Sequence, residues 1–450
     1  MTGTPCDLDM FMDWVSARSP GEDTYHQAVR DVARDVLPLV EANEAYGRDR
    51  VLERLAIPDR VIAFRVVWQN DEGGTEVHRG WRVQACNAVG PYKGGLRFHP
   101  EVTLSDLKFL AFDQTLKNAL TGLSLGGGKG GSDFDPKGRS DSEIMRFCQA
   151  FMGQLWHFTG PRTDIPAGDI NVGEREIGYL FGAYKTLRNE FEGSMTGKGL
   201  SYGGSRLRTE ATGYGLVYFL KAMLEAEGRA LDNQRAAISG AGNVAIHAAE
   251  KAIEAGAQVI SLSNSDGTLV MEDGYTSEDL AWLKTHTLDD GKRLADYAQD
   301  CGRGDWRAGE QPWGLACDVA LPCATQNELG ADAAGSLIDN GVTVVAEGAN
   351  MPCTPEAVER FEEAGVLFGP GKAANAGGVA VSGLELQQNT QRQSRERETL
   401  DTSLREIMTS INAKICNERK TSAGKIDYSA GANIAGFHHV ADALVAQGLV

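Results

Sequence analysis

The 450-residue chain has little positive charge, few cysteines and no long apolar run. Its 44 lysines and arginines stand against 62 aspartates and glutamates, which gives a formal net charge of −18 at pH 7. Because nucleic acid requires a basic binding surface, we expect no nucleic-acid partner. No apolar stretch reaches the ~18 residues of a membrane span, and the N-terminus lacks the basic and apolar regions of a signal peptide, so we expect neither.

The eight cysteines are sparse for a chain of this length. None form a CxxC pair, and no histidine lies at zinc-ligand spacing beside them, so we expect no metal site. We interpret them as reduced thiols, which indicates a cytoplasmic protein. They are Cys6, Cys86, Cys148, Cys301, Cys317, Cys323, Cys353 and Cys416.

Helices dominate the predicted elements in the first part of the chain. Apolar residues recur at helical spacing over residues 25–40, 50–57, 104–120, 142–158 and 175–191. Ser105 is the candidate N-cap of the third helix. Residues 61–68 and 75–87 are rich in β-branched and aromatic residues and flank the turn 70–74, so they predict a hairpin. The polar, glycine-rich segment 196–204 predicts the boundary to a second domain.

Beyond this boundary, strands and helices alternate, which is typical of a doubly wound parallel sheet. Strands are predicted over residues 235–239, 258–263, 319–321, 342–347 and 366–369. Helices are predicted over residues 214–227, 244–255, 396–417 and 434–449. The pattern predicts an α/β fold.

A dinucleotide fingerprint of the form GxGxxA lies between the first of these strands and the helix that follows it. Gly240 allows a tight turn, Gly242 lets the backbone approach a pyrophosphate, and the small Ala245 permits close packing of helix on sheet. Asn243 and Val244 open the helix, whose free N–H groups would face the phosphates. The pattern predicts a Rossmann-type domain that binds NAD or NADP.

The end of the second strand bears on which cofactor is bound. An acid there would bind the ribose 2′-hydroxyl and favour NAD. Ser263, Asn264 and Ser265 come first in this chain, and these neutral polar residues favour the 2′-phosphate of NADP, with Arg293 a candidate cation nearby. Asp266 follows them and keeps NAD open as the alternative.

Three lysines and one aspartate carry the predicted chemistry. Lys93 in GPYKGG and Lys129 in LGGGKGG are flanked by glycines, which implies a close approach of the backbone to another group. Lys117 follows Gln114 by three residues, so both lie on one helix face. Lys129 is followed by glycine and not by the Ser or Thr of a phosphate-binding loop, which argues against a nucleoside triphosphatase. Beside a buried lysine, Asp169 in IPAGDIN is a credible proton-transfer group.

The motifs together resemble the hexameric bacterial-type glutamate dehydrogenases, from about residue 50 to the C-terminus. The motifs that carry the resemblance include GPYKGGLRFHP, LGGGKGG, PAGDINVG, SGAGNVA, AEGANMP and GKAANAGGVAVSGLE. The resemblance implies reversible NADP-dependent oxidative deamination of L-glutamate to 2-oxoglutarate and ammonium, in the assimilatory direction, by a homohexamer. It also implies a substrate-binding and oligomerisation domain (1–203), a nucleotide-binding domain (204–426), an active site in the cleft between them and a C-terminal helix (about 427–450) returning to the first domain.

The resemblance also implies roles for single residues. Lys129 would be the catalytic lysine that activates water, and Asp169 would carry protons to and from the amine. To act as a base near neutral pH, a lysine must lower its pKa from ~10.4 to ~7–8. Burial and the positive charges of Lys93 and Lys117 act in that direction.

The remaining implied contacts divide between the substrate and the cofactor. Gln114 and Lys117 would hold the α-carboxylate, Lys93 and Ser382 the γ-carboxylate, and Gly168 would contact the substrate through its backbone. The implied cofactor contacts are Thr212, Asn243 and Asn350.

Two alternatives remain open at this stage. Dehydrogenases of branched-chain and aromatic amino acids in the same superfamily carry an apolar residue where this chain has Lys93, and a buried cation facing an apolar side chain would be uncompensated. A catalytically silent nucleotide-binding regulator would require the loss of Lys129 or Asp169, and both are present.

Overall fold

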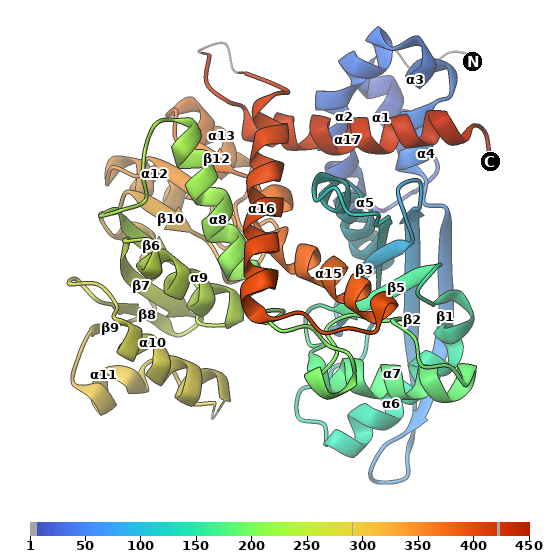
Figure 1. The fold of residues 1–450 in the computed structure, drawn as a ribbon, viewed down its shortest axis with the longest axis horizontal. Coiled ribbons are helices and arrows are strands. Elements are labelled where there is room, and N and C mark those ends of the chain that lie inside the picture. The colour runs from blue at the N-terminus through green and yellow to red at the C-terminus, as the bar shows by residue number, and fades with distance from the viewer. Residues whose placement is uncertain (1–6, 290, 421–423) are drawn as a thin grey trace. The chain divides into compact units, whose positions relative to one another are not determined.

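The computed structural model describes residues 7–289, 291–420 and 424–450, so Cys6 lies outside the described residues. The chain forms two compact units, whose elements are labelled in Figure 1. Unit 1 comprises Met1–Arg206, Ser382–Arg397 and Ala432–Val450, and unit 2 comprises Leu207–Val381 and Glu398–Gly431. The chain therefore returns to unit 1 twice after it first leaves it.

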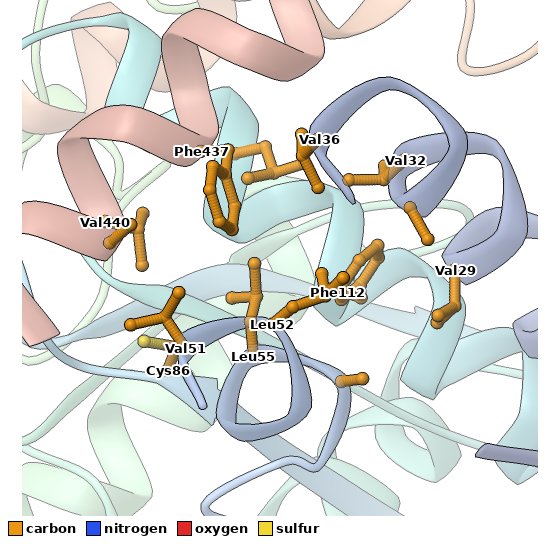
Figure 2. Close-up of a cluster of buried hydrophobic side chains, with 14 of the residues drawn as sticks. Val29, Val32, Val36, Val51, Leu52, Leu55, Cys86, Phe112, Phe437 and Val440 are labelled. Carbon is orange, nitrogen blue, oxygen red and sulfur yellow. The ribbon is translucent and has the colours of Figure 1, made fainter. Parts of the chain in front are cut away.

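The N-terminal helices of unit 1 pack with α17 around one apolar core. The bounds of the helices are α1 (Leu8–Ser16), α2 (Asp23–Ala42), α3 (Glu44–Arg48), α4 (Val51–Ala56), α5 (Leu104–Leu120) and α17 (Tyr428–Gln447). Figure 2 shows Val36 of α2, Leu52 of α4, Phe112 of α5 and Phe437 of α17 within one cluster of buried side chains. Burial of each such side chain contributes roughly 1.5–3 kcal/mol to the free energy of folding. The shared cluster therefore fixes the C-terminal helix to α5.

The sheet of unit 1 has five strands in the order β1-β2-β4-β3-β5. The strands are β1 (Arg60–Gln69), β2 (Thr75–Cys86), β3 (Tyr92–Phe98), β4 (Gly127–Ser132) and β5 (Asp164–Gly168). The predicted hairpin is confirmed, because β1 and β2 pair antiparallel. Strand β3 runs parallel to both β4 and β5. These three strands were not predicted, since glycine has a low strand propensity and hides them.

Helices α6 (Asp141–Leu155) and α7 (Glu174–Arg188) belong to a second core of unit 1, in which Phe134 and Phe147 stack at 3.8 Å. The prediction that Ser105 caps α5 is wrong. Thr103 is the N-cap and forms a capping box with Asp106, because an acid three residues after a threonine satisfies both end N–H groups. Ser105 instead accepts a hydrogen bond from the backbone N–H of Tyr25 at 3.3 Å.

The sheet of unit 2 has seven strands in the order β12-β11-β10-β6-β7-β8-β9. Their bounds are β6 (Arg235–Ile238), β7 (Gln258–Asn264), β8 (Gly267–Val270), β9 (Asp305–Ala308), β10 (Val319–Leu321), β11 (Val344–Ala346) and β12 (Leu367–Gly369). All five predicted strands are present and run parallel. The sheet is mixed, however, because β8 and β9 extend it antiparallel as a meander.

The strand order of unit 2 reverses between β6 and β10. The chain passes from β6 to β7 on one side and later continues through β10, β11 and β12 on the other. Ligands of open α/β sheets bind at the carboxyl ends of the strands at such a reversal. The helices of this part are α8 (Ala211–Ala226), α9 (Asn243–Glu254), α10 (Ser277–Leu283), α11 (Asp296–Cys301), α12 (Ala331–Asp339), α13 (Pro355–Glu363), α14 (Gly371–Ala374) and α16 (Arg397–Cys416). Helix α15 (Gly377–Gln391) begins in unit 2 and belongs to unit 1 from Ser382 onward.

In the parts of the chain that the structure describes, no helix combines the length and the apolar character that crossing a bilayer requires.

Candidate active site

A buried ion pair lies beside the carboxyl ends of β3 and β5. Lys129 on β4 donates from Nζ to Oδ1 of Asp169 at 2.8 Å. Arg97 on β3 donates from Nε to Oδ2 of the same carboxylate, also at 2.8 Å. The side chains of Lys129, Asp169 and Arg97 are only 4%, 12% and 12% exposed. Arg97 was missed by the sequence analysis, although it lies within the motif that contains Lys93.

Burial and charge act against each other in this pair. Burial lowers the pKa of Lys129 most strongly, Asp169 opposes that shift, and the positive charge of Arg97 adds to it. The net pKa of Lys129 is lower than that of an ordinary lysine. Burial alone would raise the pKa of Asp169, but Lys129 and Arg97 outweigh it and hold that pKa well below its usual range. The site therefore holds a firm carboxylate beside an ammonium that gives up its proton more readily than usual.

The loop that carries Asp169 is fixed to the end of β3. The backbone N–H of Phe98 donates to the carbonyl of Ile170 at 3.1 Å, and Nδ2 of Asn171 donates to the carbonyl of Phe98 at 2.9 Å. Asn171 has a φ of +59°, a left-handed conformation that asparagine tolerates better than most residues. These bonds hold the carboxylate between Lys129 and Arg97.

Glycines let several elements approach β3 closely. A Cβ on Gly94 would lie 1.6 Å from the carbonyl oxygen of Gly128 and 3.4 Å from Cγ of Gln114. A Cβ on Gly95 would lie 2.7 Å from Cβ of Asp169. The glycines around Lys93 predicted that another group approaches this backbone closely. The groups that do so are β4, α5 and the loop that carries Asp169.

Asn118 joins these elements and was also missed from the sequence. Its Nδ2 donates to the carbonyl of Lys93 at 3.2 Å and to that of Gly126, and its Oδ1 accepts from Nε2 of Gln114 at 2.7 Å. Lys93 is 1% exposed, and Lys117, one turn beyond Gln114, is 8% exposed. The structure thus brings Gln114, Lys117 and Lys93 to the same part of unit 1 as Lys129.

Two further candidates lie at the edges of this region. Gly168 ends β5, and a Cβ there would lie 2.3 Å from the carbonyl oxygen of Val172, so its backbone stays uncovered by a side chain. Ser382 is 2% exposed and opens the second segment of unit 1. The next residue, Gly383, lies against Leu123, in the loop that leads into β4.

A second ion pair lies beneath β3. Arg82 and Asp164 are both fully buried and form a bidentate pair, and Gln84 donates to the same carboxylate at 3.0 Å. Arg82 also donates from Nη1 to the carbonyl of Gly94 at 3.1 Å, one residue after Lys93. The pair therefore ties β2 and β5 to the strand that carries the substrate-site candidates.

The dinucleotide fingerprint forms the predicted turn in unit 2. Gly240 has a φ of +88°, and its N–H donates to Oγ of Ser263 at 3.1 Å. Helix α9 begins at Asn243 after Gly242, without a side-chain cap, and a Cβ on Gly242 would meet no atom within 4 Å. The first N–H groups of α9, including that of Val244, are thus open to an anion, so the turn fits a pyrophosphate.

Thr212 and Asn350 lie near the same carboxyl ends. Thr212 is the second residue of α8, and a Cβ on its neighbour Gly213 would lie 2.6 Å from the carbonyl oxygen of Val244 in α9. Asn350 follows β11, and its Oδ1 accepts from Nδ2 of Asn375 at 3.1 Å. Both predicted cofactor contacts therefore lie where the strand order places a bound nucleotide.

A tight hairpin follows β7 at the position that distinguishes the cofactors. Asn264 ends β7 and pairs with Gly267 of β8, and its Oδ1 accepts from the backbone N–H of Asp266 at 2.9 Å. Arg293 pairs with Asp296 at 2.8 Å, and this partner together with the charge of Asp266 raises the pKa of its guanidinium. A neutral amide, not a carboxylate, therefore ends β7, with an arginine close to the turn.

Two family models match the chain. The model described as Glutamate/Leucine/Phenylalanine/Valine dehydrogenase matches residues 203–448. The model described as Glu/Leu/Phe/Val dehydrogenase, dimerisation domain, matches residues 58–186.

Individual relatives match over almost the whole chain. The NADP-specific glutamate dehydrogenase of Escherichia coli K12 is 55% identical over 98% of this chain and 99% of that protein. The NAD-specific glutamate dehydrogenase of Bacteroides fragilis is 48% identical over 99% of this chain and 100% of that protein. The crystal structure of Plasmodium falciparum glutamate dehydrogenase superposes with a TM-score of 0.96 at 46% identity, covering 98% of this chain and 95% of that one. The chain belongs to the Glu/Leu/Phe/Val dehydrogenase family.

Proposed function

We propose that this chain is an NADP-dependent glutamate dehydrogenase, which interconverts L-glutamate with 2-oxoglutarate and ammonium. The observation that carries the proposal is the buried Lys129–Asp169 pair beside the buried cation Lys93. The high identity to relatives named NADP-specific glutamate dehydrogenase supports it.

The cations of unit 1 suit a dicarboxylate substrate. In a chain of net charge −18, an anion needs a locally basic pocket. Lys93, with Ser382, takes the γ-carboxylate, and Lys117, with Gln114, takes the α-carboxylate. Because a buried ammonium that faces an apolar side chain is costly, Lys93 selects a substrate whose side chain ends in a carboxylate.

Lys129 and Asp169 divide the proton transfers between them. The lowered pKa of Lys129 lets Nζ lose its proton and take one from the water that attacks C2 of the imine, which is left once hydride has gone from C2 of glutamate. Once Lys129 has lost its proton, the main charge that lowers the pKa of Asp169 is gone, so its carboxylate, held in place by Arg97, accepts a proton from the substrate amine. The carbonyl of Gly168 orients the amine, and NADP, when bound, supplies the oxidising equivalent.

The turn of unit 2 fits the cofactor. Gly240 and Gly242 expose the N–H groups of α9 to the pyrophosphate. Thr212 is a further cofactor contact, and Asn350 contacts the nicotinamide riboside. Asn264 at the end of β7 offers an amide and not a carboxylate to the ribose, which favours the 2′-phosphate of NADP. The NAD-specific relative at 48% identity makes NAD the second candidate.

We place the chain in the cytoplasm as a homohexamer that works in ammonium assimilation. The seven cysteines that the structure describes are free thiols, as a reducing compartment favours. The match to a dimerisation domain supports self-association, and the resemblance to hexameric bacterial-type enzymes favours six copies.

The direct test is a pair of absorbance assays that differ only in the cofactor. Purified protein is mixed with 2-oxoglutarate and ammonium, once with NADPH and once with NADH. Oxidation of the reduced cofactor is followed as the loss of its absorbance. We expect kcat/KM to be higher with NADPH by about tenfold or more, the ratio that 1.4 kcal/mol of selective binding gives. Faster turnover with NADH would reverse the cofactor assignment, and no oxidation of either would favour a nucleotide-binding regulator.

Arg97→Gln should move the pH dependence of the enzyme. Arg97 lowers the pKa of Lys129, so its loss raises that pKa, and a higher pH is needed to free the amine. The acid limb of the pH profile of kcat/KM for glutamate is therefore expected to shift to higher pH. Arg97→Lys keeps the charge and should leave the limb near its original position, whereas a shift to lower pH in Arg97→Gln would contradict the assignment.

A further inference from the structure

A cavity of about 340 Å³ opens at the other end of the unit 1 sheet. It lies where β3 and β5 begin, and its polar lining comes from Arg60, Gln84, Asn87, Tyr92, His157, Arg162 and Thr163. Arg162 precedes β5 by two residues, and Asp169 follows the last residue of that strand. A five-residue strand, roughly 16 Å long, therefore separates the cavity from the proposed catalytic pair.

The lining is basic, although the chain as a whole is acidic. Two guanidinium groups, those of Arg60 and Arg162, line the cavity, and none of its described lining residues carries a carboxylate. Asp59 lies beside the cavity, but Oδ2 of its carboxylate accepts a hydrogen bond from the hydroxyl of Tyr92 at 2.9 Å. Burial raises the pKa of Asp59, and the hydrogen bond from Tyr92 and the positive charge of Arg60 oppose that shift.

Donors in this lining have few partners within the protein. Over the ranges that the structure describes, the side chains of Arg162 and His157 form neither a hydrogen bond nor an ion pair. Among the described residues, the side chain of Arg60 donates only one long hydrogen bond of 3.4 Å, to Oε1 of Gln84. The ring of His157 is held by stacking on Trp156 at 3.7 Å, which keeps its position without using its nitrogens.

These donors reach the cavity from separate elements. Arg60 opens β1, Arg162 precedes β5, and His157 lies in the 3-10 turn Trp156–Phe158. A planar carboxylate presents two oxygens, whereas a tetrahedral phosphate presents three strong acceptors in different directions. Guanidinium groups bind phosphate in a bidentate manner. We propose that this cavity binds the phosphate group of a small phosphorylated molecule, at a site separate from both the substrate and the dinucleotide.

The test is calorimetric titration of the full-length protein with sodium pyrophosphate at constant ionic strength. NADPH is present at saturation so that the glycine turn of unit 2 is occupied. We expect one pyrophosphate site per chain. In the double variant Arg60→Gln/Arg162→Gln, its affinity should fall by about tenfold or more, as the loss of charge-assisted hydrogen bonds gives.

A matched control removes the same charge elsewhere. Arg188→Gln/Arg206→Gln also lowers the net charge by two, but these arginines pair with Glu190 and Glu396 on the surface of unit 1. This control should bind pyrophosphate as the unchanged protein does. Equal losses in both double variants would reduce the effect to general charge and overturn the proposal.

Two more titrations distinguish a phosphate site from a general anion site and from a subunit contact. Citrate replaces pyrophosphate in the first, and equal binding of citrate would overturn the assignment to phosphate. Asn87→Asp keeps both arginines but adds a carboxylate to the lining, so it should weaken pyrophosphate binding at unchanged native mass. If Asn87→Asp binds pyrophosphate normally, the anion binds elsewhere and the proposal is overturned. If the arginine variant changes the oligomeric mass and keeps its binding, the cavity is a subunit contact and not this site. The outcome does not depend on dehydrogenase activity, so the proposed function stands or falls separately.

Discussion

Lys129→Met is expected to lower kcat for glutamate oxidation by about 10³-fold, within the range that loss of a general base gives. Methionine fills the volume of the lysine stem but carries no proton. Asp169 keeps the charge-assisted hydrogen bond from Arg97, so it is not left as an uncompensated buried charge. The thermal unfolding temperature and the affinity for NADPH should therefore stay close to those of the unchanged protein.

Lys129→Arg distinguishes a base from a fixed charge. Arginine keeps the ion pair with Asp169 but cannot be deprotonated in a protein. If Nζ of Lys129 must lose its proton, the arginine variant should be about as slow as the methionine variant. Retention of more than about a tenth of the activity, the size of effect that 1.36 kcal/mol represents, would show that the charge alone suffices. Stopped-flow measurement of NADPH formation within the first turnover isolates the chemical step from product release.

Lys93→Leu is expected to lower kcat/KM for glutamate by about 10²–10³-fold, because truncating one partner of a buried charge pair costs roughly 3–4 kcal/mol. The fold should persist, since Lys93 is 1% exposed and an apolar side chain of similar size suits such a position. Steady-state kinetics with glutamate and with norvaline, which lacks the γ-carboxylate, measure the effect.

Norvaline is the internal control for this substitution. It cannot use the ammonium of Lys93, so its kcat/KM should be unchanged or should rise when leucine removes that charge. A variant that loses both activities to the same extent has lost structure and not selectivity. Unchanged glutamate kinetics in Lys93→Leu would contradict the role of Lys93 and reopen the branched-chain and aromatic alternatives.

Local patterns predicted the β1–β2 hairpin and long helices such as α2, α5 and α8, because each depends on periodicity within one segment. Helices α1, α12, α13 and α15 were not predicted. Strand β4, with the sequence GGKGGS, shows why others were missed. It contains no β-branched residue and is held by pairing with β2 and β3, which a local pattern does not record. The meander of β8 and β9 was missed because β8 opens on glycine and β9 (DWRA) carries two charged residues and no buried position, so neither shows an apolar run of strand length.

Short sequence motifs singled out Lys93, Lys129 and Asp169 as candidates, but not the side chains that hold these residues in place. Arg97 lies four residues after Lys93, so in an extended strand the two side chains share one face, and this spacing was a usable signal. Asn118 and the Arg82–Asp164 pair gave no such signal. Asp164 and the two carbonyls that Asn118 binds, those of Lys93 and Gly126, lie on other elements, and only the folded sheet brings them together, whereas Gln114 is one turn away on the same helix.

The buried Arg82–Asp164 pair restricts how this site can be redesigned. Under the proposed function, Lys93 can be exchanged by itself, because the charge that is lost is the one that a bound carboxylate would face. Arg82 and Asp164 have no such freedom, since replacing either alone leaves the other buried without its counter-charge, while an apolar pair of matching volume is often tolerated. The carbonyl of Gly94 would still lose its donor. Substrate preference can therefore drift by single substitutions, whereas the framework beneath it can change only by concerted ones.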